Sequence, residues 1–296
     1  MRIGIITADP ALDSCLRLEK EATRRGHEWV PLPLLRLAIR TSAPRLICCG
    51  EEVAPLDAAI LRLGAVLPGL AVAAGRALEQ DGVALIDPVE ALVTARDKME
   101  SLQRLSRAGV PVPETELVRD LDQLHEAVER LGGPPVVLKP LFGSQGRGAV
   151  LAESHASAVS LMESVLFLSR EFILQRYIEC GGRDTRLLVI GGEVVAAMDR
   201  TAPAGDFRSN LHRGGTATTV DPDQQVKKLA VDSAAILGLR CAGVDVLQGP
   251  DGPLVLEVNG SPGLAGIEAT TGVEVARCWI DVLEETVREG QHCEQG

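Results

Sequence analysis

The sequence lacks the marks of several common protein classes. Its seven cysteines are odd in number and scattered, with no C-x-x-C pair and no nearby histidine array, which argues against a disulfide framework or a zinc site. No stretch approaches the roughly 20 apolar residues of a membrane span, and the apolar run after Met1 is too short for a signal peptide. We therefore expect a cytoplasmic protein without a membrane-spanning segment.

Positive charge is also scarce. Acidic residues outnumber basic ones by 41 to 30, and the formal net charge is −11. This balance excludes a surface that holds nucleic acid or an anionic membrane by bulk charge. Only five of the basic residues are lysines and the other 25 are arginines, an imbalance that codon bias in a GC-rich genome explains, together with the 2% aromatic content. Any bound anion must therefore be held by locally placed cations.

The chain of 296 residues, 46% of them apolar, is long enough for two or three layered domains. Short apolar runs at 3–7 and 58–63 predict strands, and they alternate with predicted helices at 14–25 and 71–80. Such alternation indicates a parallel sheet with crossover helices. We assign this α/β unit to residues 1–95.

Two further units are predicted after it. A single helix over 89–109 leads through a proline-stiffened linker to a helix and a buried strand, which indicates a small α+β unit at 96–174. The last unit, at 175–296, contains a hairpin at 185–198, a helix and a final hairpin. The predicted fold class is therefore α/β and α+β.

The final hairpin is the most informative segment. Apolar strands at 242–247 and 254–259 flank a Gly-Pro-Asp-Gly turn that we centre on Asp251. In that register Asp245 and Glu257 face each other across the two strands. Two like charges so close are destabilising unless something positive lies between them.

Alternation along the second strand places Glu257 and Asn259 on the same face. The apolar face is predicted to carry Leu254, Leu256 and Val258. Asp245, Glu257 and Asn259 form an oxygen-only set that suits a hard cation, magnesium or manganese. The alternative is an edge hairpin whose acidic face meets water.

A second candidate segment combines a lysine with glycines. Lys139 ends an apolar strand and precedes a glycine-rich loop at 143–148. Glycines let the backbone approach anionic oxygens closely, and a lysine supplies a mobile point charge. The segment has neither the Walker spacing nor G-x-G-x-x-G, and alone it would be a flexible turn. Together with the acidic hairpin, a nucleotide site is the better explanation.

Several motifs in a fixed order carry a resemblance to a known family. They are Arg96-Asp97-Lys98, Val137-Leu138-Lys139, the loop at 143–148, Gln175-Arg176-Tyr177-Ile178, Asp184-Thr185-Arg186, GDFRSNLHRGG at 205–215 and Glu257-Val258-Asn259-Gly260-Ser261-Pro262-Gly263. Together they resemble the ATP-grasp superfamily, and more narrowly the RimK-type α-L-glutamate ligases, which extend the C-terminus of a small-subunit ribosomal protein with glutamate. The similarity runs from Met1 to about residue 285.

The resemblance implies an ATP-grasp fold with an N-terminal parallel-sheet α/β domain, a small central lid subdomain and a C-terminal antiparallel-sheet subdomain. It implies a ligase that joins L-glutamate to a C-terminal carboxylate through an acyl phosphate, releasing ADP and phosphate, and that acts as a homo-oligomer. Two alternatives remain. The acceptor could be a carrier protein or a cofactor tail, or the chain could be an ATP-regulated binding module without turnover.

The resemblance also assigns roles to single residues. The residues implied to bind ATP are Lys98, Lys139, Gly143, Ser144, Gln145, Gly146, Arg176, Tyr177, Asp184, Arg208, Ser209 and Asn210. Asp245, Glu257 and Asn259 would hold two divalent cations, with Glu257 bridging them. Arg186 and Arg208 are candidates for steadying the acyl phosphate, because guanidinium matches carboxylate and phosphate oxygens. Arg62 would either bind a substrate carboxylate or form a salt bridge.

Overall fold

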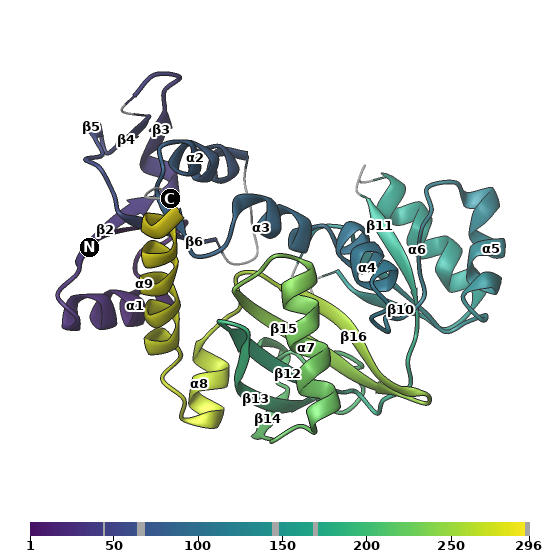
Figure 1. Ribbon diagram of the computed structural model, residues 1–296. Helices are drawn as coiled ribbons and strands as arrows, with labels where there is room; N and C mark the ends of the chain where they lie inside the picture. Colours follow the sequence, from purple (N-terminus) through teal and green to yellow (C-terminus); the bar gives the residue numbers. More distant parts are fainter. Residues whose placement is uncertain (44, 64–68, 144–147, 168–170, 294–296) are drawn as a thin grey trace.

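The computed structural model describes residues 1–43, 45–63, 69–143, 148–167 and 171–293 (Figure 1). Three main sheets follow one another along the chain, the first parallel and the other two antiparallel, and each is covered by helices. No helix in this described part is both long and apolar enough to cross a membrane. The predicted mixture of α/β and α+β units is confirmed.

The first sheet is parallel, with the strand order β2-β1-β6-β7, as the alternation of strands and helices predicts. Its strands are β1 (Arg2–Thr7), β2 (Glu28–Pro33), β6 (Ala58–Arg62) and β7 (Ala84–Leu85). A small antiparallel sheet that we did not predict is inserted before β6. It comprises β3 (Leu37–Ile39), β4 (Leu46–Cys48) and β5 (Glu51–Glu52), and the short 3-10 helix η1 (Leu34–Arg36) precedes it.

Helices cover both faces of this sheet. Helix α2 (Gly69–Gln80) packs on one face, where Ile6 of β1 joins its core cluster, and α1 (Asp13–Arg24) packs on the other. The last helix, α9 (Val275–Cys293), returns from the far end of the chain to lie beside α1, and Trp279 is buried there with Ile3 (Figure 1). The end of the chain therefore completes the core of the first unit.

The predicted helix over 89–109 is in fact two helices, α3 (Val89–Arg96) and α4 (Lys98–Arg107). Asp97 lies between the two helices and caps the start of α4, because its Oδ1 accepts hydrogen bonds from Met99 N at 2.9 Å and Glu100 N at 3.0 Å. An aspartate in this N-cap position satisfies amides that would otherwise lack a partner. The prediction of one continuous helix is wrong for this reason, and the break brings Arg96 and Lys98 to the site described below.

The second sheet is antiparallel, with the order β10-β9-β11-β8. Its strands are β8 (Thr115–Leu117), β9 (Val136–Pro140), β10 (Val150–Ala152) and β11 (Phe172–Arg176). Two helices, α5 (Leu121–Arg130) and α6 (His155–Phe167), cover one face, and Leu124 and Val128 of α5 are buried against Leu138 of β9. We call this unit the lid.

The third sheet is antiparallel, with the order β14-β13-β12-β15-β16. Its strands are β12 (Arg183–Ile190), β13 (Glu193–Thr201), β14 (Thr216–Thr219), β15 (Cys241–Gly249) and β16 (Gly252–Asn259). Helix α7 (Gln224–Ile236) covers one face through an apolar cluster, and η2 (Leu211–Arg213) and α8 (Ala265–Thr271) complete the unit (Figure 1). Its opposite face turns toward the candidate site.

Candidate active site

The hairpin of β15 and β16 confirms that Asp245 faces Glu257. Gly249 pairs with Gly252, however, so the turn is centred between Pro250 and Asp251. This centre lies half a residue before the predicted one at Asp251. Continued along the strands, that register would place Asp245 opposite Leu256. The pairing shifts between Asp245 and Val246, where a β-bulge makes Leu256 an extra residue on β16. Asp245 therefore pairs with Glu257, as predicted.

The same bulge changes which side chains share a face. Val255 and Val258 are both buried in the core, three residues apart, whereas Leu256 and Glu257 both line a cavity on the other side. The prediction that Leu254, Leu256 and Val258 form one apolar face is therefore wrong. An apolar side chain thus lies beside Glu257 in the site, where strict alternation would have turned it away.

A network of two acids and two arginines crosses the third sheet. Arg186 donates from Nε and Nη2 to the two oxygens of Asp245, both at 2.6 Å. Arg200 makes the same bidentate contact with Asp184, at 2.7 and 2.6 Å, and its Nη2 also lies 2.8 Å from Asp245 Oδ2. Ser209 donates to Asp184 Oδ2 at 2.7 Å. Asp184, Asp245 and Arg200 are all buried, so the network is a desolvated one.

Burial and charge act in opposite directions on these carboxyl groups. Burial alone would raise the pKa of Asp245, but the charges of Arg186 and Arg200 outweigh it and hold that pKa below its usual range. Burial and the neighbouring charge of Asp245 raise the pKa of Asp184, despite its contact with Arg200. Asp245 is therefore the firmly ionised member of the pair.

Two lysines enter the same space from the lid side. Lys98 Nζ donates to the carbonyl oxygen of Gly143 at 2.7 Å, and Lys139 Nζ donates to Gln175 Oε1 at 2.6 Å. Burial lowers the pKa of both ammonium groups, that of Lys139 to about 8, although the charge of Glu257 opposes the shift. Neither lysine is paired with a carboxylate among the described residues, which leaves two half-buried cations facing the cavity.

Two further predicted residues, Asn259 and Arg208, have visible partners. Asn259 Nδ2 donates to Glu257 Oε1 at 3.0 Å, so the amide oxygen of Asn259 stays available. Arg208 binds Asp206 through Nε at 2.8 Å and Ala149 O through Nη1 at 2.9 Å, and so ties the third sheet to the lid. Its guanidinium is thus already engaged, in contrast to a free phosphate-binding group.

One cavity between the lid and the third sheet gathers most of the predicted site residues. It is lined, among others, by Lys98, Lys139, Gly143, Arg176, Tyr177, Asp184, Arg208, Ser209, Asn210, Asp245 and Glu257. We call it the first cavity. Ser144, Gln145 and Gly146 lie outside the described residues. Apolar side chains complete its lining, namely Val137, Ile178, Leu247 and Leu256.

A second cavity adjoins the first and reaches the parallel sheet. The two share Lys98, Gly143, Arg200, Asn210, Leu256 and Glu257 in their walls. Its other charged lining residues are mostly arginines, namely Arg62, Arg96 and Arg186, and it also includes Asn259. Burial lowers the pKa of Arg96, which makes no ion pair with any residue that the structure describes. Arg62 and Arg96 therefore bring positive charge to the second cavity without an acidic partner among the described residues, whereas Arg186 is paired with Asp245.

Arg62 ends strand β6 and is almost fully buried, with 4% of its surface exposed. Its Nη1 donates to Ser261 Oγ at 2.7 Å, its Nη2 donates to Pro262 O at 2.5 Å, and its guanidinium lies 5.1 Å from the Trp279 ring centroid. Burial lowers its pKa to about 10. Of the two alternatives for Arg62, a salt bridge is not formed within the described residues; the side chain instead anchors the loop after Asn259.

Sequence reasoning missed Arg200, Arg96 and the apolar lining residues. Arg200 offered one signal, since it is a charged residue near the end of a strand whose other residues are largely apolar. Arg96 stands in the motif Arg96-Asp97-Lys98 but was given no role, and Leu256 was placed on the apolar face, because an interrupted helix and a bulge decide where these two side chains point. Both are consequences of local capping and pairing that the pattern of apolar residues does not reveal.

Comparison with known proteins agrees with this geometry. Residues 1–92 match the family description "RimK PreATP-grasp domain", and residues 95–283 match "RimK-like ATP-grasp domain". A protein of Aliivibrio fischeri named "Probable alpha-L-glutamate ligase" is 43% identical over 289 residues, which cover 97% of this chain and 96% of that protein.

Solved structures show the same fold. The RimK domain protein ATP-grasp from Sphaerobacter thermophilus is 25% identical, with a TM-score of 0.76, over 96% of this chain and 99% of that one. The ATP-grasp ligase PsnB, complexed with minimal precursor, Mg and ADP, is 20% identical, with a TM-score of 0.73, over 96% of this chain and 98% of that one. This chain belongs to the RimK-like ATP-grasp family and is an ATP-dependent, amide-forming ligase with the ATP-grasp fold.

Proposed function

We propose that this ligase adds L-glutamate to the C-terminal carboxylate of an acidic acceptor, a ribosomal protein tail or a glutamate-ended peptide. The observation that carries the proposal is the pair of adjoining cavities that share Glu257. The first would hold ATP, and the second would hold the two carboxylate-bearing substrates. The A. fischeri relative is named a glutamate ligase, and PsnB was solved with a precursor, which supports these substrate classes.

The lining of the second cavity favours acidic substrates. Arg62, Arg96 and Arg186 line it together with Lys98 and Arg200, whereas its acidic lining residues are Asp13 and Glu257. A guanidinium pairs with a carboxylate through two parallel hydrogen bonds, so such a lining selects planar anions. Glutamate and a glutamate-ended acceptor bring several carboxylates to one place. In a protein of net charge −11, this local excess of cations is the feature that would hold them.

The donor groups of the first cavity, together with Asn259 of the adjoining second cavity, fit ATP and divalent cations. Lys98 and Lys139 would bind phosphate oxygens, and Asp245, Glu257 and Asn259 supply the oxygen donors that magnesium or manganese prefers. When bound, two such cations would screen the charge of the phosphates. Asp245 now accepts from Arg186 and Arg200. We propose that Arg186 leaves Asp245 when a cation binds there and turns to the transferred phosphoryl group.

The reaction that these residues support proceeds through an acyl phosphate. The acceptor carboxylate attacks the γ-phosphorus, the bond to the β-phosphate oxygen breaks, and ADP leaves. The amino group of glutamate then attacks the acyl carbon and displaces phosphate. Arg186 stabilises the charge on the phosphoryl oxygens.

We also propose a role for each of the three predicted units. The unit at 1–95 helps to bind the acceptor, the unit at 96–174 is the lid, and the unit at 175–296 supplies the metal-binding hairpin.

Mass spectrometry of the reaction products tests the proposed function. The protein, ATP, magnesium and glutamate are incubated with a glutamate-ended peptide, with the same peptide amidated at its C-terminus, or without peptide. The free peptide should gain whole glutamate residues while ADP and phosphate are released. Modification of the amidated peptide would refute acceptor activation at the C-terminus. ATP binding without turnover on the free peptide would refute this class of acceptor.

Lys139→Met should weaken ATP binding by about 10- to 100-fold, because a half-buried ammonium facing the proposed phosphate site is lost. Since the pKa of Lys139 is lowered to about 8, the protein's affinity for ATP should also fall between about pH 7 and pH 9, as this cation loses its proton. Calorimetric titration with ATP at several pH values measures both effects. The fall above pH 8 should be absent in the variant; its persistence would assign the titration to another group.

Arg96→Met should raise the KM for the acidic acceptor by about tenfold while the KM for ATP changes little. Arg96 lines the second cavity and not the first, and no described residue pairs with it. Steady-state kinetics with each substrate varied in turn measure the effect. Arg183→Met is the matched control, because Arg183 lines the first cavity only. Equal effects of Arg96→Met on both KM values would contradict the assignment of the second cavity to the acceptor.

A further inference from the structure

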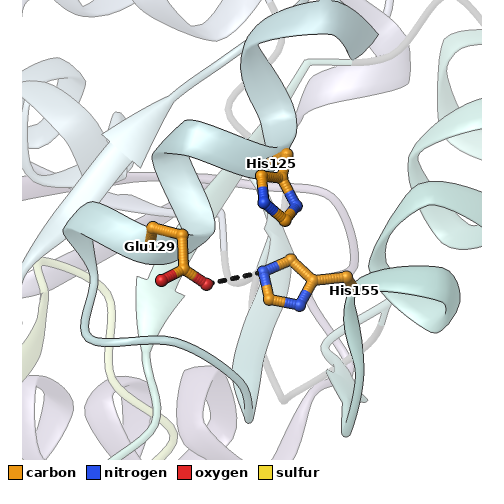
Figure 2. Close-up of side chains that lie close together, drawn as sticks. All are labelled: His125, Glu129 and His155. Atoms are coloured by element: carbon orange, nitrogen blue, oxygen red, sulfur yellow. Dashed lines mark ion pairs between the residues drawn. The ribbon is translucent and has the colours of Figure 1, made fainter.

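The lid carries a cluster of two histidines and one glutamate that lies outside both cavities. His125 and Glu129 lie one turn apart on α5, and His155 is the first residue of α6. Figure 2 shows the three side chains pointing toward one another between the two helices. One nitrogen from each imidazole and one carboxylate oxygen all lie within 4.8 Å of one another. The two histidines, His125 and His155, are 30 positions apart in the chain, so their spacing in the sequence does not reveal a histidine array.

The positions of these side chains are set by neighbouring structure. Leu124 and Val128 are buried against the lid sheet, and this fixes the adjoining side of α5, where His125 and Glu129 each follow one residue later. Ser154 Oγ accepts from Ser157 N at 3.2 Å in the first turn of α6, which fixes the place of His155. The ligand atoms are therefore held by two helices that are already packed.

The contacts within the cluster leave ligand capacity unused. His155 Nε2 lies 2.8 Å from Glu129 Oε1, yet this buried nitrogen makes no hydrogen bond of good geometry. The His125 and His155 rings lie 4.3 Å apart, centroid to centroid, and are inclined by 38°. Ligands about 2.1 Å from a tetrahedral ion lie about 3.4 Å from one another, so small side-chain rotations would complete a three-ligand site.

We propose that His125, Glu129 and His155 bind a divalent transition metal ion of the zinc type. Two imidazoles and one carboxylate suit zinc, cobalt or copper, whereas the all-oxygen set of Asp245, Glu257 and Asn259 suits magnesium. The ion joins α5 to α6 and so stiffens the lid. This reverses the expectation, drawn from the cysteines and the missing histidine array, that the chain has no zinc site.

The test is a titration of the purified protein with Co²⁺ in millimolar Mg²⁺, so that oxygen sites are saturated. We expect one Co²⁺ per chain with a visible spectrum of nitrogen ligation, displaced by Zn²⁺, and a higher midpoint of thermal unfolding with Zn²⁺ present. His125→Gln and Glu129→Gln should each lower the association constant by at least about tenfold. His125 is exposed and Gln preserves its polarity, so that variant should fold normally.

His27→Gln is the matched control. His27 Nε2 lies 2.8 Å from Glu284 Oε1, the same pair contact as in the cluster. Metal binding should be unchanged in this variant. Because all variants keep every cysteine and the Asp245–Glu257 pair, a loss confined to the α5 and α6 substitutions assigns the ion to the cluster. Absence of Co²⁺ binding, or binding that survives both His125→Gln and His155→Gln, would overturn the proposal without affecting the proposed ligase activity.

Discussion

Replacing Glu257 with glutamine should lower turnover by about 10²- to 10³-fold while the fold stays intact. The substitution keeps the shape of the side chain and the oxygen that accepts from Asn259 Nδ2 at 3.0 Å. It removes only the negative charge, on which the binding of divalent cations depends. ADP release at saturating ATP, glutamate and acceptor measures the effect, and urea unfolding of the same variant measures stability.

The control for this substitution is Glu193→Gln, at the exposed start of β13 in the same sheet. Its turnover and its urea midpoint should both equal those of the unchanged protein. Normal turnover in Glu257→Gln would refute the metal assignment for this residue. A parallel loss of stability and turnover would instead show that Glu257 acts through the fold.

Arg200→Met should cost about 3–5 kcal/mol of the free energy of unfolding, the largest effect on stability that we expect from one substitution in the site. Arg200 is 3% exposed and contacts both Asp184 and Asp245. Without it, two buried carboxylates lie close together with Arg186 as the remaining nearby cation. Urea unfolding at pH 7, followed by fluorescence and circular dichroism, measures the loss.

The pH dependence of this loss identifies its cause. The pKa of Asp184 is already raised by burial and by the charge of Asp245. Removing Arg200 raises it further above the unfolded value, so the penalty applies above the folded pKa and disappears as the carboxyl group is protonated. The deficit should therefore shrink from pH 7 to about pH 5. A loss of the same size at both values would indicate that packing, and not charge, is the cause.

A surface ion pair serves as the control for Arg200→Met. Arg76 lies 3.2 Å from Glu90, and their side chains are 53% and 68% exposed. Arg76→Met should change the free energy of unfolding by less than about 1 kcal/mol, because water screens such pairs and already solvates both ions. A comparable loss in both variants would show that the method does not resolve the buried network.

Much of the fold was predictable where local pattern decides it. The strands of the first sheet alternate with helices in the way typical of a parallel sheet, and Lys139 lies near the end of β9 after three apolar residues. Helix α9 was not predicted, because nothing local indicates that the last residues of the chain complete the core around Ile3. The interruption at Asp97 was missed because apolar periodicity continues across the cap.

The sequence alone determined the chemical inventory: an acidic pair on one hairpin, two lysines in nucleotide-like motifs, and the family to which the motifs belong. The tertiary structure decided which atoms meet. A bulge of one residue turned Leu256 toward the site, since side chains alternate with a period of two and one added residue exchanges the faces. Arg62, Arg96 and Arg186 come together in one cavity from distant segments, because only packing, and not spacing along the chain, brings them there.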